Sequence, residues 1–235
     1  MFWNKIISFE SIPSTNSFLL DHYAEYDDLT LVEAVRQTNG RGRKGRVWHS
    51  DENSLTFSFL LKDKKYLEKY KEISILMAYG LIRVLEEYGL KASIKWPNDV
   101  YAKGRKIAGI LLQGIAKERL ECLIVGIGIN VNNDRFEDEF LREPTSLKIE
   151  LDKDIDQQEF RDKVYDSILR TIVSKEDFYE DISSHDYLKG QEAYALVSDE
   201  KRKVRVIGID RDYSLKIETE GKTMNIDSGE ISFHL

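Results

Sequence analysis

The sequence predicts an α+β protein in which a large N-terminal domain of strands and helices precedes a small all-β barrel. Apolar residues recur at helical spacing in two long segments, 71–88 and 157–178, which indicates amphipathic helices. Several shorter segments are almost continuously apolar, as buried strands are. After about residue 185 the chain changes to short alternating segments separated by polar and glycine turns, a pattern typical of a barrel of roughly fifty residues.

The predicted helices have ordinary start and stop signals. A first, short helix follows Pro13, because Ser14 or Thr15 can accept hydrogen bonds from its free backbone amides. The second helix ends at Gly89, a residue that favours the left-handed conformation found after helix C-termini. The third helix has an apolar face that consists of Phe160, Val164, Ile168, Leu169, Ile172 and Val173.

Strands account for most of the remaining ordered segments. They are expected in the N-terminal domain at 5–9, 29–35, 55–61, 92–96, 106–113 and 120–129, and in the barrel at 204–209, 213–219, 223–226 and 231–233. The last three strands of the N-terminal domain are nearly all apolar at their centres, which indicates that both of their faces are covered. Residues 38–50 form a loop between the second and third strands.

The composition is that of an ordinary soluble globular protein, with 41% hydrophobic and 33% charged residues. The net charge of −7 argues against sequence-independent binding to DNA or RNA, which needs many phosphate-neutralising cations. The single cysteine, Cys122, excludes an internal disulfide and a cysteine-built metal site, and its apolar surroundings predict a buried strand residue. No signal peptide and no membrane-spanning run of ~18 apolar residues are visible, so we expect a cytoplasmic protein.

The most unusual segment is the loop between residues 36 and 48, which holds five cations, three glycines and no acidic residue. In an acidic protein this local reversal of charge favours an anionic ligand. Gly40 and Gly42 allow successive backbone amides to converge on negative charge. Arg41 and Arg43 add planar donor groups suited to phosphate and carboxylate. The alternative is a solvated loop, or an arginine–glycine segment that contacts RNA.

A second candidate site is the run Lys95-Trp96-Pro97-Asn98-Asp99. Proline restricts the preceding residue to an extended conformation, so Lys95 is expected at the end of a strand beside a sharp turn. Apolar neighbours deprive its ammonium group of full hydration, which is costly without an anionic or carbonyl partner. The alternative is a lysine whose ammonium group extends past the apolar surface into water.

Two further runs are less specific. Gly126 and Gly128 allow a ligand to approach the backbone of a strand, and Asn130 offers a neutral donor and acceptor at the end of that strand. This run lacks the third glycine of a dinucleotide-binding fingerprint. The other run, 14–16, is most simply explained by helix capping. The four histidines lie in unrelated contexts, so neither a catalytic triad nor a metal cluster is expected.

Together and in this order, these runs resemble the biotin–protein ligase family. The resemblance covers essentially the whole chain, and the arginine–glycine loop and the run 95–99 are its most specific parts. The matching segments are 14–16, Gln37 with 40–48, 95–99 with 106–111, and 126–131, followed by 208–210 and 229–232 in the C-terminal part.

The resemblance implies a mixed β-sheet with helices packed on one face, of the class II synthetase and biotin ligase type, in residues 1–186. It implies an SH3-like barrel in residues 187–235. The implied enzyme forms biotinoyl-5′-AMP from biotin and ATP with Mg²⁺, and transfers biotin to a lysine of a biotin carboxyl carrier protein. A monomer or weak homodimer is expected. No DNA is expected as a partner, because the first strand begins at once, without the N-terminal DNA-binding domain of repressor-type relatives.

The resemblance also implies roles for individual residues. Lys95 and Arg43 are expected to be catalytic, with Lys95 facing the reacting carboxylate. The implied biotin-binding residues are Ser14, Thr15, Asn16, Gln37, Gly40, Arg41, Gly42, Arg43, Lys95 and Gly109. The implied nucleotide-binding residues are Arg41, Arg43, Arg46, Trp48, Asn98, Lys106 and Asn130. No protein ligand to a metal is implied.

Two positions depart from the family pattern. Gln113 stands where relatives usually carry a glutamate, and no aromatic residue is clearly placed to stack on adenine, although Phe136 and Phe140 are candidates. A lipoate or octanoate ligase of the same fold is the nearest alternative, distinguished by a different loop signature. A non-enzymatic RNA-binding module is the alternative from another class, but it leaves the run 95–99 unexplained and finds no basic face elsewhere.

Overall fold

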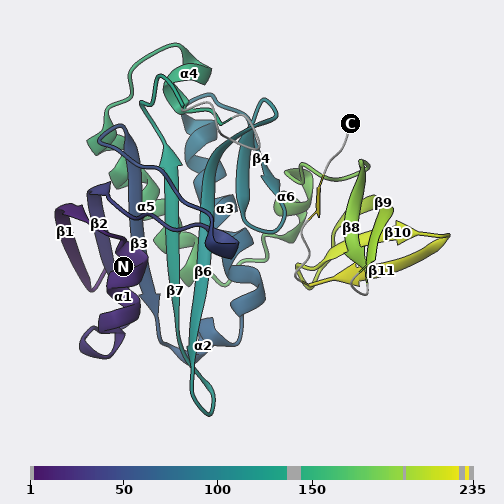
Figure 1. Cartoon of the computed structure of the whole chain (residues 1–235), viewed down its shortest axis with the longest axis horizontal. Coiled ribbons are helices and arrows are strands. Elements are labelled where there is room, and N and C mark those ends of the chain that lie inside the picture. The colour runs from purple at the N-terminus through teal and green to yellow at the C-terminus, as the bar shows by residue number, and fades with distance from the viewer. Residues whose placement is uncertain (1–2, 137–143, 198–199, 228–230, 233–235) are drawn as a thin grey trace.

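The computed structural model describes residues 3–136, 144–197, 200–227 and 231–232 of the chain. Its larger part is a seven-stranded sheet in the order β1-β2-β3-β7-β6-β5-β4 (Figure 1). β1 and β2 are parallel and the other pairs are antiparallel, so the sheet is mixed, as expected. Its strands are β1 (Lys5–Ile12), β2 (Thr30–Gln37), β3 (Ser54–Leu61), β4 (Ala92–Lys95), β5 (Asp99–Ala102), β6 (Arg105–Ala116) and β7 (Leu120–Asn130).

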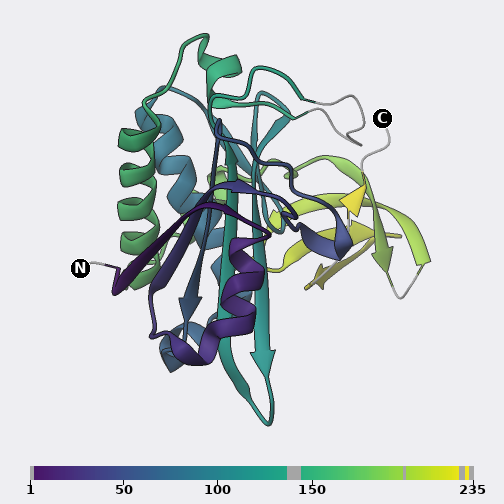
Figure 2. The same cartoon turned by 60° about the vertical axis from the view of Figure 1, so that its left-hand side comes forward.

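Helices cover this sheet unequally. The two long helices, α3 (Tyr70–Glu87) and α5 (Gln157–Val173), pack side by side over one face and bury most of the apolar core (Figure 2). The short α1 (Thr15–His22) packs on the opposite face, where Leu19 joins Leu60 and Ile124 in a small second cluster. The predicted fold class is confirmed. On the second face of the sheet, α1 covers only the part around Leu60 and Ile124.

The long helices begin and end where local chemistry dictates. Gly89 follows α3 with a φ of +83°, and Leu90 N donates to the carbonyl of Leu85, as expected for a glycine-terminated helix. The predicted end of the third helix at residue 178 is wrong. α5 ends at Val173, because the Ser174 hydroxyl accepts from Glu176 N and this turn replaces the helical hydrogen bonds.

Several short elements escape the sequence patterns. The apolar periodicity that identifies longer elements is too short to detect in α2 (Lys64–Leu67), α4 (Leu147–Leu151), α6 (Tyr179–Ser184) and β5, and in the 3₁₀ turns Tyr23–Glu25 and Arg43–Gly45. β7 is buried on both faces, as predicted, and Cys122 lies in it fully buried. β6 extends beyond the predicted strand 106–113 to Ala116, and in this added end Gly114 and Ala116 are exposed.

The C-terminal part is a five-stranded antiparallel sheet in the order β11-β10-β9-β8-β12, where an SH3-like barrel is expected. Its strands are β8 (Glu192–Val197), β9 (Glu200–Ile209), β10 (Leu215–Thr219), β11 (Lys222–Ile226) and β12 (Ile231–Ser232). β8 was not predicted, since its inward residues Ala193 and Ala195 give only a weak alternation. Phe233, the predicted end of the last strand, lies outside the described residues.

The two parts are joined by backbone pairing and side-chain contacts. Ile94 N donates to the carbonyl of His185 and Tyr187 N donates to that of Ile94, so the connecting segment continues the edge of the larger sheet. The indole Nε1 of Trp96 donates to the carbonyl of Tyr213 at 3.0 Å. Among the described residues, no helix is long and apolar enough to cross a membrane.

Asp186 anchors this junction, and we predict that it contributes more to stability than an exposed acid nearby. Its carboxylate accepts from Leu188 N at 2.9 Å and from Ile209 N at 3.0 Å. Asp186→Ala leaves both amides without these partners and should lower the free energy of unfolding by about 1–3 kcal/mol in urea titrations. Glu192→Ala is the control, since its 2.6 Å pair with Lys203 is exposed and should contribute far less to stability. Equal losses would contradict the anchoring role.

Candidate active site

The candidate site lies on the second face of the sheet, along β7. Side chains alternate along a strand, so Gly126, Gly128 and Asn130 share the face that α1 covers at Ile124. Gly126 lies opposite Ser58 of β3, and Gly128 lies opposite Thr56. The absence of side chains at the two glycines creates a floor over which residues from α1 and the arginine–glycine loop can lie.

Two side chains approach this floor closely. A Cβ atom added at Gly128 would lie 2.3 Å from Cε2 of Trp48, and one at Gly126 would lie 2.7 Å from Nδ2 of Asn16. Both distances are shorter than real Cβ atoms show, so neither position can accept a side chain without displacing its neighbour. The sequence predicts that a ligand approaches these glycines, whereas in the structure Trp48 and Asn16 make the close approach.

Polar residues from three separate segments surround the contact between Gly126 and Asn16. The Thr15 hydroxyl lies 2.8 Å from that of Ser58, and the Gln37 Oε1 accepts from both Thr15 N and Thr15 Oγ1. Ser14 caps α1 by accepting from Ser17 N. Ser14, Thr15, Asn16 and Ser58 are each less than 5% exposed. Four of the residues predicted to bind biotin, Ser14, Thr15, Asn16 and Gln37, thus come together, with Ser58 added.

The amide of Asn16 is the exceptional member of this group. Both Oδ1 and Nδ2 are buried, and neither has a hydrogen-bond partner within the described part of the chain. A buried polar group without a partner costs about 1–3 kcal/mol, so such groups are rare. This amide therefore presents one acceptor and one donor to a ligand that supplies the complementary pair.

The arginine–glycine loop is a compact hairpin. Gly42 N donates to the carbonyl of Arg46, Trp48 N donates to that of Gly40, and Arg41 pairs with Val47. The exposed side chains of Arg41 and Arg46 line a cavity of about 510 Å³ between the loop and β6.

Arg43 ties this loop to the turn after β4. Its guanidinium donates to Oδ1 of Asn98 at 2.8 Å, and Nδ2 of Asn98 donates to the carbonyl of Ile110. Arg43 and Asn98 also line a second cavity, of about 400 Å³, together with Tyr213 from the turn between β9 and β10. Two residues that lie 55 positions apart in the sequence are thus held as one unit.

Lys95 is buried, with 5% of its surface exposed, so the alternative in which its ammonium group extends into water is wrong. Its Nζ donates to the hydroxyl of Tyr101 at 3.2 Å and lies 4.7 Å from the centre of that ring. Burial, followed by the nearby Asp99 and Tyr187, raises the pKa of Tyr101, so the phenol remains neutral at physiological pH. The lysine thus has a neutral partner.

A second lysine lies at the same end of the site. The ammonium group of Lys106 pairs with Asp99 at 2.7 Å and lies 5.7 Å from the centre of the Trp48 ring. A Cβ added at Gly109 would lie 3.1 Å from that ammonium group. Cross-strand pairing joins Lys95 to Asp99, Asp99 to Gly109 and Gly109 to Gly128, so this row runs along one face of the sheet.

Asn130 has a structural contact that the sequence did not predict. Its Nδ2 donates to the carbonyl of Thr145 at 2.9 Å.

Gln113, where relatives usually carry a glutamate, faces the loop cavity, and its buried Oε1 has no hydrogen-bond partner among the described residues. Phe136 is half-buried, and Phe140 lies outside the described residues.

Two residues of the site, Ser58 and Tyr101, were missed from the sequence, and Asp99 was given no role although it lies in the run 95–99. Ser58 lies in a predicted strand, where it is as deeply buried as the neighbouring Phe57 and Phe59. The alternation of polar and aromatic residues in this strand is visible in the sequence, but only the structure shows that its polar face is buried too. Tyr101 gave no signal, because β5 itself was not predicted.

The chain is similar in sequence to proteins of known family. Residues 8–130 match the biotin/lipoate A/B protein ligase family, to which the chain therefore belongs. It is 36% identical over 219 residues to the bifunctional ligase/repressor BirA of Bacillus spizizenii, a match that covers 86% of this chain and 65% of that protein. It is 34% identical over 130 residues to the Escherichia coli protein of that name. The chain thus spans less than two thirds of the length of these relatives.

The fold extends the similarity to the whole chain. The biotin protein ligase from Aquifex aeolicus in complex with biotin and ATP superposes with a TM-score of 0.84 at 33% identity. This match covers 97% of the present chain and 98% of that one. The C-terminal sheet is therefore part of the shared architecture.

We predict that Gly128 is required for the ordered position of the loop. In Gly128→Ala, the new methyl group must displace the Trp48 ring and with it the hairpin that begins at Gly40. Limited digestion with trypsin should then accelerate several-fold at Arg41, Arg43, Lys44 and Arg46, since cleavage follows the population of the open loop. Gly114→Ala is the control, because its methyl group meets only the flexible end of Leu120. Unchanged cleavage in Gly128→Ala would contradict the role of this contact.

Proposed function

We propose that this chain is an ATP-dependent biotin–protein ligase that forms biotinoyl-5′-AMP and transfers biotin to a lysine of a biotin carboxyl carrier protein. The observation that carries the proposal is the buried, unpartnered amide of Asn16 beside Thr15, Ser58 and Gln37. A ureido ring has both N–H donors and a carbonyl acceptor. These are the two kinds of partner that the Oδ1 and Nδ2 atoms of Asn16 lack. Relatives named as biotin ligases support the same reading.

The opposite end of the site suits a carboxylate and a nucleotide. Lys95, Arg43 and Lys106 are cations that contact Tyr101, Asn98 and Asp99 respectively. Together with Gly40, Gly42 and Gly109, they would bind the biotin carboxylate and the α-phosphate. Arg41, Arg46, Trp48, Asn98 and Asn130 complete the proposed nucleotide site.

The first half-reaction joins two anions, so repulsion must be reduced before they can react. An oxygen of the biotin carboxylate attacks the α-phosphorus of ATP, the bond to the β-phosphate breaks, and pyrophosphate leaves. Positive groups fixed before the reaction stabilise the charge that develops on the phosphoryl oxygens without reorganising. Lys95 suits this role, because a buried lysine on a strand end is held more accurately than one on a loop.

In the second half-reaction, the neutral amine of the acceptor lysine attacks the acyl carbon of biotinoyl-AMP. The acyl–phosphate bond breaks, AMP leaves and the amine loses a proton. Lys95 would stabilise negative charge on the acyl oxygen or on the departing phosphate. No covalent enzyme intermediate is required, in keeping with burial raising the pKa of the thiol of Cys122.

Magnesium would enter with ATP as part of the substrate. Among the described residues, no three histidine, cysteine or acidic side chains lie close enough to hold a metal ion. Mg²⁺ is commonly bound through substrate phosphates with few protein ligands, so such a site needs no protein cage.

The proposal extends to partners and location. We propose a monomer or weak homodimer that acts in the cytoplasm, with 1–186 as the catalytic domain and 187–235 as the SH3-like domain. Lipoate and octanoate ligases remain the relevant alternative, because the matched family includes lipoate ligases. The RNA-binding alternative has less support, since it gives no role to the buried amide of Asn16 or to the buried Lys95.

Exchange of labelled pyrophosphate into ATP tests the proposed function directly. We predict exchange that depends on biotin, with lipoate and octanoate at least ~10²-fold worse, because a site built to hydrogen-bond a ureido group leaves its own groups unpaired with other acids. Asn16→Ala should weaken the preference for biotin. Comparable exchange with all three acids would refute the assignment, and no exchange with any acid would refute an adenylate-forming ligase.

Lys95 and Arg43 should differ in the step that they serve. Lys95→Met keeps the buried aliphatic stem and should slow both half-reactions by about 10²–10³. Arg43→Ala should still form the adenylate but release it, because it loses the contact that holds the loop to Asn98. Single-turnover measurements of adenylate formation, release and transfer separate these effects. The exposed Lys65→Met is the control for Lys95. Near-normal adenylate formation in Lys95→Met would remove this residue from catalysis.

A further inference from the structure

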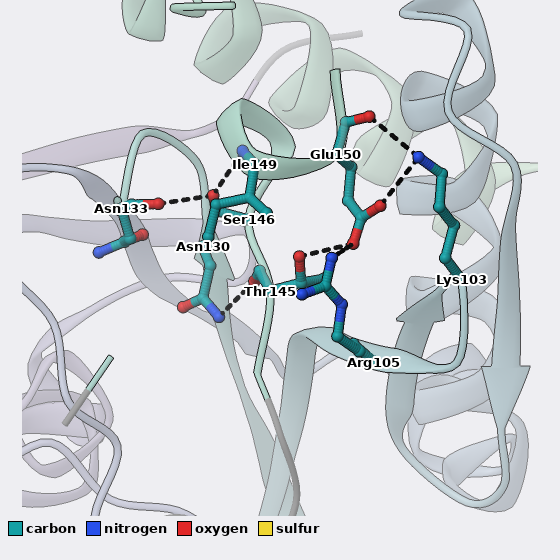
Figure 3. A network of polar contacts seen from close by, with 8 residues as sticks. All are labelled: Lys103, Arg105, Asn130, Asn133, Thr145, Ser146, Ile149 and Glu150. Carbon is teal, nitrogen blue, oxygen red and sulfur yellow. Dashed lines mark hydrogen bonds and ion pairs between the residues drawn. The ribbon is translucent and has the colours of Figure 1, made fainter. Parts of the chain in front are cut away.

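Glu150 is a deeply buried acid outside the residues so far assigned to the site. Its side chain is 1% exposed and contacts two cations: Oε1 lies 2.7 Å from NH2 of Arg105, and Oε2 lies 3.2 Å from Nζ of Lys103. The hydroxyl of Thr145 donates to the same Oε1 at 2.6 Å (Figure 3). Burial works to raise the pKa of Glu150, but the Thr145 hydrogen bond and the two cations outweigh it and the pKa lies below its usual range.

The carboxylate is connected to the nucleotide end of the site through Thr145. The backbone of Thr145 accepts from Nδ2 of Asn130 at 2.9 Å, and its N–H donates to the carbonyl of Lys106 at 2.8 Å. Arg105, the other partner of Glu150, directly precedes Lys106. One buried carboxylate thus fixes the end of β7 and the beginning of β6, the two places that supply Asn130 and Lys106.

The position of Glu150 is itself fixed from the other side. Ser146 caps the short helix α4: its hydroxyl accepts from Ile149 N at 3.1 Å and donates to the carbonyl of Asn133 at 2.7 Å (Figure 3). Lys148 N donates to the carbonyl of Val131 at 2.9 Å. These hydrogen bonds attach α4 to the segment that follows β7. A movement of Glu150, which lies on α4, would therefore also move Thr145 and Arg105, the residues that its carboxylate contacts.

We propose that Glu150 is a positioning residue for nucleotide binding, acting through Thr145 and Arg105 on Asn130 and Lys106. The inference rests on the proposed function for the identity of the nucleotide. It predicts selectivity within the site: loss of the carboxylate disturbs the nucleotide end, whereas the polar group around Asn16 and Ser58 belongs to α1 and β3 and has no contact with this network in the described structure.

Calorimetric binding of α,β-methylene-ATP and, separately, of biotin tests this selectivity. Glu150→Gln should weaken binding of the ATP analogue about tenfold while biotin affinity stays within about twofold, a coupling of the size that buried networks show. Thr145→Val removes only the hydroxyl that Glu150 binds and should weaken the analogue in the same direction. Because both changes act through one contact, the double variant should lose less than the product of the two single effects.

Glu121→Gln is the matched control. Its carboxylate accepts from Tyr23 at 3.0 Å and pairs with Lys117 at 3.3 Å at the opposite end of β7, so both ligands should bind it normally. Unchanged nucleotide affinity in Glu150→Gln and Thr145→Val, or equal weakening of biotin, would overturn the proposal. Should Glu150→Gln not fold, Thr145→Val alone decides the question.

The readouts also separate this inference from the proposed function. A wild-type protein that binds the ATP analogue but shows no biotin-dependent exchange refutes the ligase, while the Glu150 variant still reports on nucleotide positioning. A wild-type protein that binds no nucleotide refutes both.

Discussion

The site depends on the two positions of β7 that have no side chain. Gly126 and Gly128 lie side by side with Ser58 and Thr56 of β3, and each lies beneath a side chain from another segment. Asn16 reaches the first from α1, and Trp48 reaches the second from the arginine–glycine loop. Because a single methyl group at either position would overlap these neighbours, the strand, the helix and the loop must assemble together.

Charge is organised around the same floor. The protein is acidic overall, but one loop contains several cations. Their mutual repulsion favours an open conformation of that loop. Individual contacts oppose that tendency: Asn98 holds Arg43, Asp99 pairs with Lys106, and Lys95 lies against the neutral Tyr101. Two of these three partners are neutral, so the cations keep most of their capacity to attract an anion.

The asparagine-rich end of β7 joins the site to its surroundings. Asn130 binds the carbonyl of Thr145, Asn132 exchanges two hydrogen bonds with the backbone of Ile155, and Asn133 binds Asp51 and Ser54. Each amide thus holds a different segment beside the strand end. Glu150 binds the hydroxyl of Thr145, whose carbonyl holds Asn130, and its buried charge is paired with Arg105 and Lys103.

The sequence by itself determined the long elements and the chemistry of the site. Periodic apolar residues identified α3, α5 and β7, and the unusual loop and the run 95–99 identified the cationic end, because these signals lie within short stretches of chain. Only the tertiary structure decided which groups meet. It buried Lys95 against Tyr101 of an unpredicted strand, joined Arg43 to Asn98, brought Ser58 to Thr15 and linked Glu150 to Asn130 through Thr145. Each of these contacts follows from cross-strand register and loop closure, which depend on the whole sheet rather than on any local pattern.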